Sequence, residues 1–575
     1  METLLLASLL AVIAIIIICY GTVHNRRIRR YEISRIREGY GKPNDREYKE
    51  GEYAHIQGYY KVHSMDMDDC PDDGVTETCR YRIDDITWND LNMDDIYRSI
   101  DRCQSSAGDE YLYYLLRDPR KDVCDRDRFE ELVSYYSDNA DDRLSTSVLL
   151  HDIGRTGKYS IYDYINNLDA LSGKTAFKDW ILLAVYAVAI TACIVSGDYA
   201  RGISVAALIF ALMYGGISYF ARKREIEPYV VSFSYILRLL KGAALIIDKG
   251  DDKIDIEKGV LKEASSNMAG FARMSGMIMN SSGSSGNPLE IVIDYLKMFT
   301  HIDIIKFFSM RDDVNRHRDD IDRLLTSIGF IDTSIAVASY RSFLGTYCIP
   351  EFGGTGIEAS GLFHPLLEEP VANDLNLSRG MLLTGSNASG KSTMLRTITV
   401  AALLAQSIGT VPAASYRAPF FRIYTSLSLN DSILAGESYY MTEIRALKRI
   451  VDAGKEEGLP ILAAVDEVLR GTNTVERISA STAIMRQLAV VDGIILAATH
   501  DLELTELLDD MYDNYHFEET IENDDISFAY KLLPGRATTR NAIRLLDIMG
   551  YDKELISEAE KMAEGYMQSG EYMRV

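Results

Sequence analysis

The stretch GSNASGKST, at residues 385–393, decides the fold of the C-terminal half, because it fits the pattern Gly, four residues, Gly-Lys-Ser/Thr. The apolar run MLLT before it predicts a strand, and MLRTITVAALLAQ, from residue 394, predicts a helix. A strand, a glycine-rich loop and a helix in this order wrap a polyphosphate with backbone N–H groups, and the positive end of the helix faces the phosphates. The sequence therefore predicts a site for a nucleoside triphosphate.

The residue types in this loop have separate chemical roles. Glycines let the backbone curl around the phosphates, Lys391 reaches the β and γ phosphates, and the Ser392 hydroxyl is a ligand for Mg²⁺. We therefore expect ATP and Mg²⁺ to bind here. The predicted nucleotide-binding residues of the loop are Gly385, Ser386, Asn387, Ala388, Ser389, Gly390, Lys391, Ser392 and Thr393.

Two apolar runs downstream end in residues that suit phosphate chemistry. ILAAVDE, at 461–467, places Asp466 to hold Mg²⁺ through water and Glu467 to orient or deprotonate the water that attacks the γ phosphate. ILAATHD, at 495–501, places His500 to sense the γ phosphate from a neighbouring strand. An ordinary strand end at the surface remains the alternative for the Asp-Glu pair. Phosphate loop, Asp-Glu and Thr-His in this order match ATPases of the ABC type, in which two nucleotide domains sandwich ATP.

Composition limits the possible partners. The 575 residues exceed what one hydrophobic core usually organises, so we expect two to four domains. The net charge of −24 excludes indiscriminate attraction to nucleic acid over the whole surface, so any DNA contact must be local. The 7 cysteines lack the paired CxxC spacing of a zinc site, which favours a reduced, cytosolic setting.

Three apolar runs predict membrane-spanning helices. The first, Leu4–Tyr20, carries no charge and is preceded by Glu2 and followed by arginines, which favours an uncleaved anchor over a signal peptide. The other two, Ile181–Val195 and Ile203–Phe220, are separated by SGDYARG and predict a helical hairpin at about 180–221. For the run of about 15 residues at Ile181–Val195, a buried helix of a soluble domain remains an alternative.

The flanking charges predict one topology. Lysines precede the hairpin and a cluster of basic residues follows it, so the positive-inside rule puts about 24–178 and everything after 222 in the cytoplasm. The expected protein is a multi-pass protein of the cell membrane, in contact with membrane lipid through three helices, with its ATPase domain in the cytoplasm.

At this point the chain resembles the MutS family of DNA mismatch-repair ATPases. The resemblance is carried by separate stretches, most of them in the last 220 residues and looser before. They are TWNDLNMDDIY, SSAGDEYLYYLLR, IDTSIAVASYR, FHPLLEEPVANDLNL at 363–377, TGSNASGKSTMLRT at 384–397, SIGTVPA at 407–413, NDSILAGESYYMTEI at 430–444, DEVLRGTNT at 466–474, ATHDLEL at 498–504 and FAYKLLPG at 528–535.

The resemblance implies a mixed α and α/β fold, in which a helical core/lever domain with transmembrane helices precedes a C-terminal ABC-type P-loop ATPase domain. The expected boundaries are 1–23 for the anchor, 24–79 for a cytoplasmic linker, 80–345 for the helical core and lever, and 346–575 for the ATPase domain.

The resemblance also implies further site residues. Ser438 would reach the ATP of a partner chain in a homodimer, and RGTNT, with Asn473, would contact the dimer partner. Val371 and Tyr530 would hold the adenine between them. For Tyr530, a plain core position is the alternative.

One departure from the family bears on function. The family reads mismatches with an N-terminal domain that uses a Phe wedge, whereas the first phenylalanine here is Phe129, so that domain is expected to be missing. Two hypotheses follow: a membrane-tethered ATPase that switches DNA-binding arms on mismatched or branched DNA, and a membrane-bound switch that acts on a protein partner. An ABC-type transporter would need an LSGGQ-like signature after the phosphate loop, and the nearest match, LSGK at 171–174, precedes it.

Overall fold

The computed structural model describes most of the chain. The described residues are 20, 23–44, 46–48, 51–68, 81–119, 123–156, 160–168, 174–274, 295–386, 389–427, 439–469, 473–522, 525–537, 543, 546 and 549–569. The predicted first span, at 4–20, lies almost wholly outside these residues.

The chain forms two compact units, and each draws on several stretches of sequence. Unit 1 comprises Met1–Cys70, Ile100–Tyr114 and Asp127–Phe343. Unit 2 comprises Pro71–Ser99, Leu115–Arg126 and Leu344–Val575. The last of these divisions falls between Phe343 and Leu344, and two short upstream stretches also belong to the unit that carries the phosphate loop.

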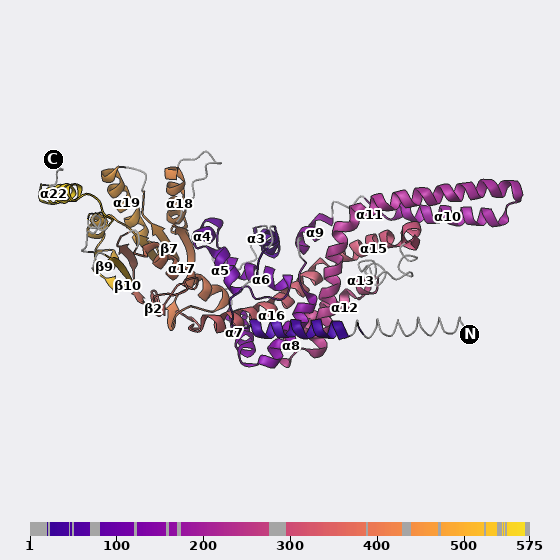
Figure 1. Ribbon diagram of the computed structural model, residues 1–575, viewed down its shortest axis with the longest axis horizontal. Helices are drawn as coiled ribbons and strands as arrows, with labels where there is room; N and C mark the ends of the chain where they lie inside the picture. Colours follow the sequence, from indigo (N-terminus) through magenta and orange to yellow (C-terminus); the bar gives the residue numbers. More distant parts are fainter. Residues whose placement is uncertain are drawn as a thin grey trace. The chain divides into compact units, whose positions relative to one another are not determined.

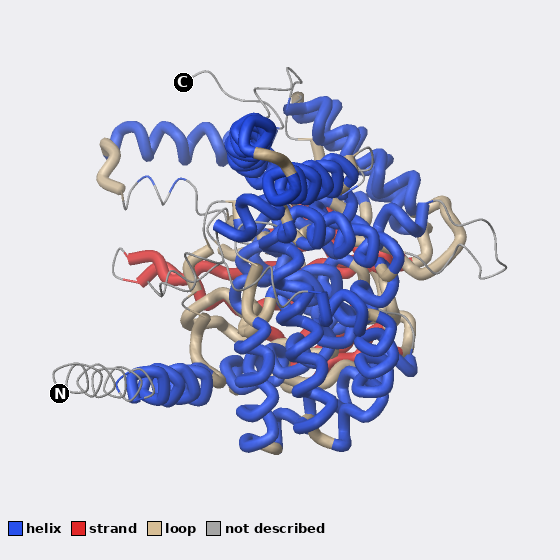
Figure 2. Tube along the Cα trace, turned by 90° about the vertical axis from the view of Figure 1, so that its right-hand side faces the viewer, coloured by secondary structure: helices blue, strands red, loops and turns tan. Residues whose placement is uncertain are grey.

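Helices make up most of the described structure, with strands confined to the C-terminal part (Figures 1 and 2). Residues 23–39 are helical, and the further helices are α2 (Glu52–Ile56), α3 (Gly58–Asp68), α4 (Asp85–Asp90), α5 (Met93–Ile100), α6 (Ser106–Arg117), α7 (Val123–Asp138), α8 (Ala140–Ile153), α9 (Ile161–Asn167), α10 (Phe177–Val195), α11 (Asp198–Lys249), α12 (Asp255–Asn267), α13 (Ala269–Met274), α15 (Ile302–Arg316), α16 (Arg318–Leu344), α17 (Lys391–Ile408), α18 (Tyr439–Ala453), α19 (Thr474–Ala489), α20 (Leu502–Leu507) and α22 (Lys553–Ser569). The strands are β1 (Glu351–Phe352), β2 (Ile357–Leu362), β3 (Asn373–Leu377), β4 (Gly380–Thr384), β5 (Ser415–Ala418), β6 (Arg422–Ser426), β7 (Ile461–Asp466), β8 (Gly493–Ala498), β9 (Tyr512–Glu522) and β10 (Asp525–Pro534).

Unit 1 carries the helical hairpin that the sequence predicts. Helices α10 and α11 lie side by side, and their inner faces meet at Leu182, Tyr186 and Ala211 (Figure 1). Gly215 allows this approach, because a Cβ there would lie 1.9 Å from the Tyr186 hydroxyl. Helix α11 does not end after the apolar run but continues to Lys249, which gives it a total length of 52 residues, since the Arg, Lys and Glu residues that follow are good helix formers. One face of its C-terminal half is buried in unit 1, with Phe233 2% exposed.

Unit 2 is built around a six-stranded sheet in the order β10-β9-β4-β8-β7-β6. Strands β9, β4, β8, β7 and β6 pair in parallel, and β10 is the antiparallel edge strand. Strand β7 is buried along almost its whole length, as expected for a parallel strand covered on both faces. Because β4, β8 and β7 are parallel neighbours, their carboxyl ends meet at one edge of the sheet. The second sheet, in the order β1-β5-β2-β3, has 4 strands.

Hydrogen bonds explain why the stretch with α4 belongs to unit 2. The buried Asp90 carboxylate accepts from the Thr425 hydroxyl at 2.7 Å and from the Leu427 backbone N–H at 2.9 Å. The Asp90 carbonyl accepts from Arg396 Nε, on α17, at 2.8 Å. Helix α4 is therefore fixed both to the end of β6 and to the helix that follows the phosphate loop.

Candidate active site

The predicted phosphate loop joins β4 to α17, and its backbone requires glycine. Gly385 has φ 147° and Gly390 has φ 95°, values that disfavour any residue with a Cβ. A Cβ at Gly385 would lie 2.7 Å from the Ser389 hydroxyl. Helix α17 begins at Lys391 and has no side-chain cap, so its first N–H groups are available to an anion. Asn387 and Ala388 lie outside the described residues.

Two side chains test whether the loop fits a triphosphate. Lys391 is 4% exposed, and its Nζ donates to the carbonyls of Gly385 and Ser386 at 2.9 and 2.8 Å, so the ammonium lies inside the curl of the loop. The Ser386 hydroxyl is buried and has no hydrogen-bond partner among the described residues. A buried cation beside an unsatisfied hydroxyl fits an anionic ligand with several oxygens. Thr393 lies half-buried in the first turn of α17.

The predicted metal ligands lie together. Ser392 Oγ, in the first turn of α17, donates to Asp466 Oδ2, at the end of β7, at 2.5 Å. Hydroxyl and carboxylate oxygens are the ligand types that Mg²⁺ prefers, so this pair fits a Mg²⁺ ion held with phosphate oxygens.

Glu467 and His500 also converge on this edge of the sheet. His500 Nε2 lies 2.8 Å from Glu467 Oε1 and 3.3 Å from Lys391 Nζ. Glu467 adopts φ 53°, a left-handed conformation that is rare for a residue with a side chain and is typical of functional sites. The Glu467 N–H donates to the Ala498 carbonyl at 2.9 Å, which fixes this conformation against β8.

Two residues that the sequence did not single out, Glu443 and Ser481, hold the turn after Glu467. Leu469, also left-handed at φ 62°, donates its N–H to the buried Glu443 carboxylate at 2.5 Å. Ser481 Oγ, on α19, donates to the Val468 carbonyl at 3.0 Å. Asn473 caps α19 by accepting from the Glu476 N–H at 3.0 Å. Residues 470–472 of the RGTNT segment, and Ser438, lie outside the described residues. The role of Glu443 is visible only in the structure, because the sequence MTEI alone predicts only a helix.

The two residues predicted to hold adenine share one partner. The Asn373 side-chain amide donates to the Val371 and Tyr530 carbonyls at 3.1 and 3.0 Å, and its oxygen accepts from the Leu532 N–H at 2.8 Å. Tyr530 has φ 51° and is 44% exposed, and its ring would lie 3.2 Å from a Cβ at Gly390. The structure thus brings Tyr530 to the phosphate loop and links it to Val371 through Asn373. The burial of Asn373 and its contacts with Tyr530 and Leu532 are visible only in the structure.

Comparison with known proteins agrees with this geometry. Residues 381–566 match the family model described as MutS domain V. This part of the chain is a MutS-type ATPase domain. The chain is 29% identical over 296 residues to the DNA mismatch repair protein MutS 2 of Haloarcula marismortui, which covers 45% of this chain and 31% of the relative. It is 30% identical over 263 residues to the DNA mismatch repair protein MutS of Thermus aquaticus. This alignment covers 45% of this chain and 32% of that relative. It is 28% identical over 288 residues to the DNA mismatch repair protein MutS of Lactobacillus helveticus. This alignment covers 48% of this chain and 33% of that relative. These alignments span about a third of the length of each of these relatives.

Proposed function

We propose that this chain is a MutS-like, Mg²⁺-dependent ATPase that works as a homodimer tethered to the cell membrane and switches DNA-binding arms. The observation that carries the proposal is the convergence of Lys391, Ser392, Asp466, Glu467 and His500 at the carboxyl ends of three parallel strands. The MutS-type ATPase domain supports the ATPase part.

The residues divide the work of hydrolysis. Lys391 and the N–H groups of the loop bind and orient the phosphates, while Ser392 and Asp466 would hold the metal. Held by these two residues, Mg²⁺ would supply neutralisation of charge on the phosphate oxygens. Glu467 accepts the proton of the attacking water, and His500, 2.8 Å away, orients the carboxylate and contacts the γ phosphate.

A second chain fits the open side of this site. The Glu467 side chain is 22% exposed and that of His500 is 36% exposed, so water reaches both groups. Phosphoryl transfer sites usually close against water, and closure by a partner chain, with its Ser438 at the phosphates, would do this. The homodimer and the role of Ser438 rest on the resemblance.

The hairpin supports the membrane tether. Two helical segments, Phe177–Val195 and Ala200–Ile226, are long and apolar enough to cross a bilayer, each with a mean hydropathy of 1.8. Many of their large apolar side chains are exposed, as Phe210 and Ile217 are at 73% and 72%. Exposed apolar surface of this length is costly in water and favourable in lipid.

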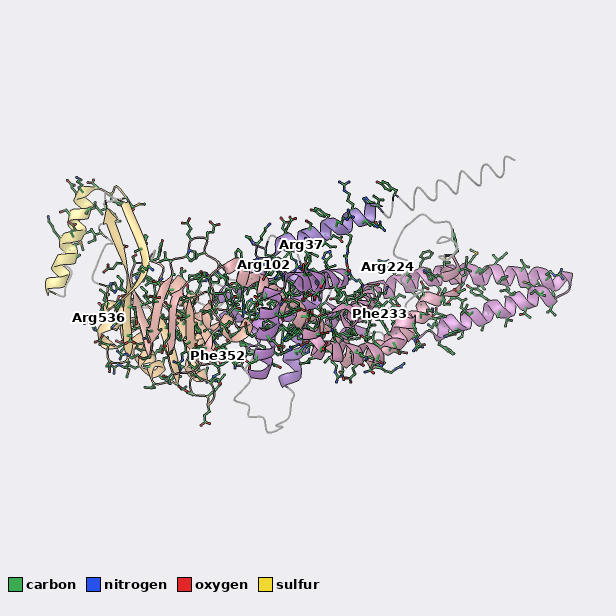
Figure 3. The ribbon with its side chains drawn as sticks, turned by 90° about the horizontal axis from the view of Figure 1, so that it is seen from below. Arg37, Arg102, Arg224, Phe233, Phe352 and Arg536 are labelled. Carbon is green, nitrogen blue, oxygen red and sulfur yellow. The ribbon has the colours of Figure 1, made fainter. Side chains whose placement is uncertain are left out.

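Charged and aromatic residues gather at the base of the hairpin. Arg222 Nη1 lies 2.5 Å from Asp179 Oδ2, and the same carboxylate group bonds to His301 Nδ1, next to α15, at 2.8 Å. Trp180 is 59% exposed at this level, where tryptophan is typical of a membrane interface. Arg224, labelled in Figure 3, follows on α11. The basic residues predict that this base faces the cytoplasm, and the ATPase domain would lie on that side.

Whether the chain binds DNA is the part of the proposal that an experiment must decide. We would embed the full chain in lipid nanodiscs and measure its binding to homoduplex, mismatched and branched DNA at low and moderate salt, with and without ATP. The proposal predicts binding that weakens as salt rises and changes with ATP.

A protein partner is the second candidate, and the net charge of −24 favours it. Absence of DNA binding at low salt in every nucleotide state would contradict the DNA-switching proposal and leave a membrane-bound switch for a protein partner.

A further inference from the structure

Unit 1 contains a cleft that has no part in the ATPase site. Its volume is about 710 Å³, which is within the range of small-molecule sites. It lies between the end of the helix over 23–39, the chain that follows it, the loop between α5 and α6, helices α8 and α16 of the core, and Arg155 after α8. Arg37, on the first helix, and Arg102, on the loop between α5 and α6, both line the cleft and lie near each other in Figure 3.

The lining of this cleft is basic, although the chain as a whole is acidic. Seven cationic side chains line it, against three carboxylates. The cations are Arg35, Arg37, Lys42, Arg46, Arg102, Arg143 and Arg155, and the carboxylates are Glu38, Asp101 and Asp141. Asp109 and Glu52, which pair with two of these arginines, still leave the cations in excess. In a chain with 61 basic and 85 acidic residues, this local excess is the reverse of the average.

Part of this charge is neutralised within the fold. Arg46 Nη1 lies 2.7 Å from Asp101 Oδ2 and 3.0 Å from Asp109 Oδ2, and Arg155 Nε lies 2.8 Å from Asp109. Burial raises the pKa of Asp109 to about 6, and both arginines oppose that rise. Cys103 lies beside these carboxylates, but the guanidinium groups already occupy them. This cluster is therefore the structural floor of the cleft and not a metal site.

Two other arginines of the lining contact backbone carbonyls and aromatic rings. Arg143 donates to the Tyr136 and Ser137 carbonyls at 2.5 and 3.2 Å and lies 3.5 Å over the Tyr40 ring. Arg102 donates to the Lys42 carbonyl at 3.0 and 2.7 Å through two nitrogens and lies 5.0 Å over Phe343. Carbonyls and rings orient a guanidinium group without cancelling its charge. Burial lowers the pKa of Arg102, as expected for a cation that has lost water.

The rim adds cations that water still reaches. Arg35, Arg37 and Lys42 are exposed and lie on the segment that forms one wall of the cleft. Oriented arginines inside a cleft and exposed cations at its entrance form an arrangement that attracts and then binds an anion.

We propose that this cleft binds a small soluble molecule that carries two or more phosphate groups. The volume exceeds the need of a single phosphate, and cations from several segments suit phosphates in a chain. A phospholipid head group has the same chemistry. However, at about 1.5 Å per residue, Arg35 lies roughly 18 Å along the helix from Val23, away from the predicted anchor, which favours a soluble ligand. The inference concerns a site separate from the proposed ATPase function and does not depend on it.

The test uses inorganic tripolyphosphate as the probe. The full chain in zwitterionic nanodiscs carries Lys391→Ala to weaken the phosphate loop, and binding is measured by calorimetry without Mg²⁺. We expect binding at one site, with a Kd that rises at least tenfold when Arg102→Gln and Arg143→Gln are added. Arg323→Gln, an exposed arginine on α16 outside the cleft, is the matched control and should change Kd less than twofold.

Two further experiments control for misfolding of the variants and distinguish a soluble ligand from a lipid head group. Arg37→Glu with Lys42→Glu, both exposed, should weaken binding as strongly while leaving the melting temperature unchanged. No binding in the Lys391→Ala chain, or an unchanged Kd in both cleft variants, would overturn the proposal. Dihexanoyl-phosphatidylglycerol below its micellar concentration should not displace the probe; displacement would overturn the assignment to a soluble ligand.

Discussion

The phosphate loop and the hairpin both depart from the usual pattern, in which charged side chains are exposed and large apolar side chains are buried. At the loop, a cation is buried, with Lys391 4% exposed; at the hairpin, a large apolar side chain is exposed, with Phe210 73% exposed. The proposed function assigns a ligand to each region, phosphate to the loop and lipid to the hairpin. The two regions differ in how many side chains are involved. The phosphate site depends on a few side chains fixed by short contacts, whereas the apolar surface of the hairpin is made by many interchangeable side chains. One substitution should therefore remove the chemistry of the first, while the second should respond to depth in the bilayer.

The largest effect is expected at Glu467. Glu467→Gln keeps the shape of the side chain but removes the base, so ATP should still bind and hydrolysis should fall about a thousandfold, or about 4 kcal/mol in barrier. Single-turnover hydrolysis and size-exclusion chromatography with ATP would measure the rate and the trapped dimer. Glu457→Gln, at an exposed position, is the control. Unchanged turnover in the Glu467 variant would remove this residue from the mechanism.

The hairpin should respond to a charge at membrane depth. Phe210→Asp should cost about 3 kcal/mol of insertion free energy. Cys193, half-buried on α10, reports this through labelling by a water-soluble maleimide, read by peptide mass spectrometry in nanodiscs. We expect Cys193 to be protected in the parent chain and to react at least ten times faster in the variant.

Val475→Asp, an equally exposed apolar site on α19, is the control for this measurement, since Val475 is 77% exposed in unit 2. It should leave the labelling of Cys193 unchanged. Fast labelling of Cys193 in the parent chain would show that the hairpin does not lie in lipid.

A third prediction concerns packing in the helical core, away from both regions. A Cβ at Gly108, on α6, would lie 2.4 Å from Asp332 Oδ2, and this carboxylate accepts from the Ser105 N–H and hydroxyl at 2.8 and 2.6 Å. Gly108→Ala should lower the free energy of unfolding of unit 1 by about 1–3 kcal/mol. Gly259→Ala, on α12, has nothing within 4 Å of the new Cβ and should be neutral or stabilising. Hydrogen exchange of unit 1 would measure both; equal stability of the two variants would contradict the packing argument.

The smallest effect is a dependence on pH in unit 2. Burial, with the nearby charge of Arg396, lowers the pKa of His364 to about 4 from 6.5. The unfolded chain then binds the extra proton, so stability is lost as pH falls below 6.5, by about 1 kcal/mol between pH 6.5 and 5.5. His364→Asn keeps an acceptor for the Leu366 N–H, which lies 3.3 Å from His364 Nδ1, but cannot titrate. Hydrogen exchange of unit 2 at both pH values should show the loss only in the parent chain, and an equal loss in the variant would contradict this assignment.

Short sequence motifs predicted the residues of the site whose positions depend on local geometry. Lys391 and Ser392 follow from one loop, and Asp466, Glu467 and His500 follow from strands whose ends had to meet if the sheet was parallel. Asn373 and Glu443 could not be predicted in the same way, because their roles depend on hydrogen bonds to Tyr530 and Leu469, far along the chain.

The grouping of residues also required the structure. Helix α4 belongs to the unit with the phosphate loop because Asp90 bonds to Thr425 and Leu427, more than 300 residues away. Hydropathy predicted the hairpin but not the length of α11, since the charged stretch that ends an apolar run does not end a helix.

The measurement that tests the central claim most directly is ATP hydrolysis by the purified full chain in nanodiscs, beside its Lys391→Ala variant. The account predicts turnover that requires Mg²⁺ in the parent chain and is lost in the variant. A parent chain that neither binds nor hydrolyses ATP, or a variant that turns over at the parental rate, would contradict it.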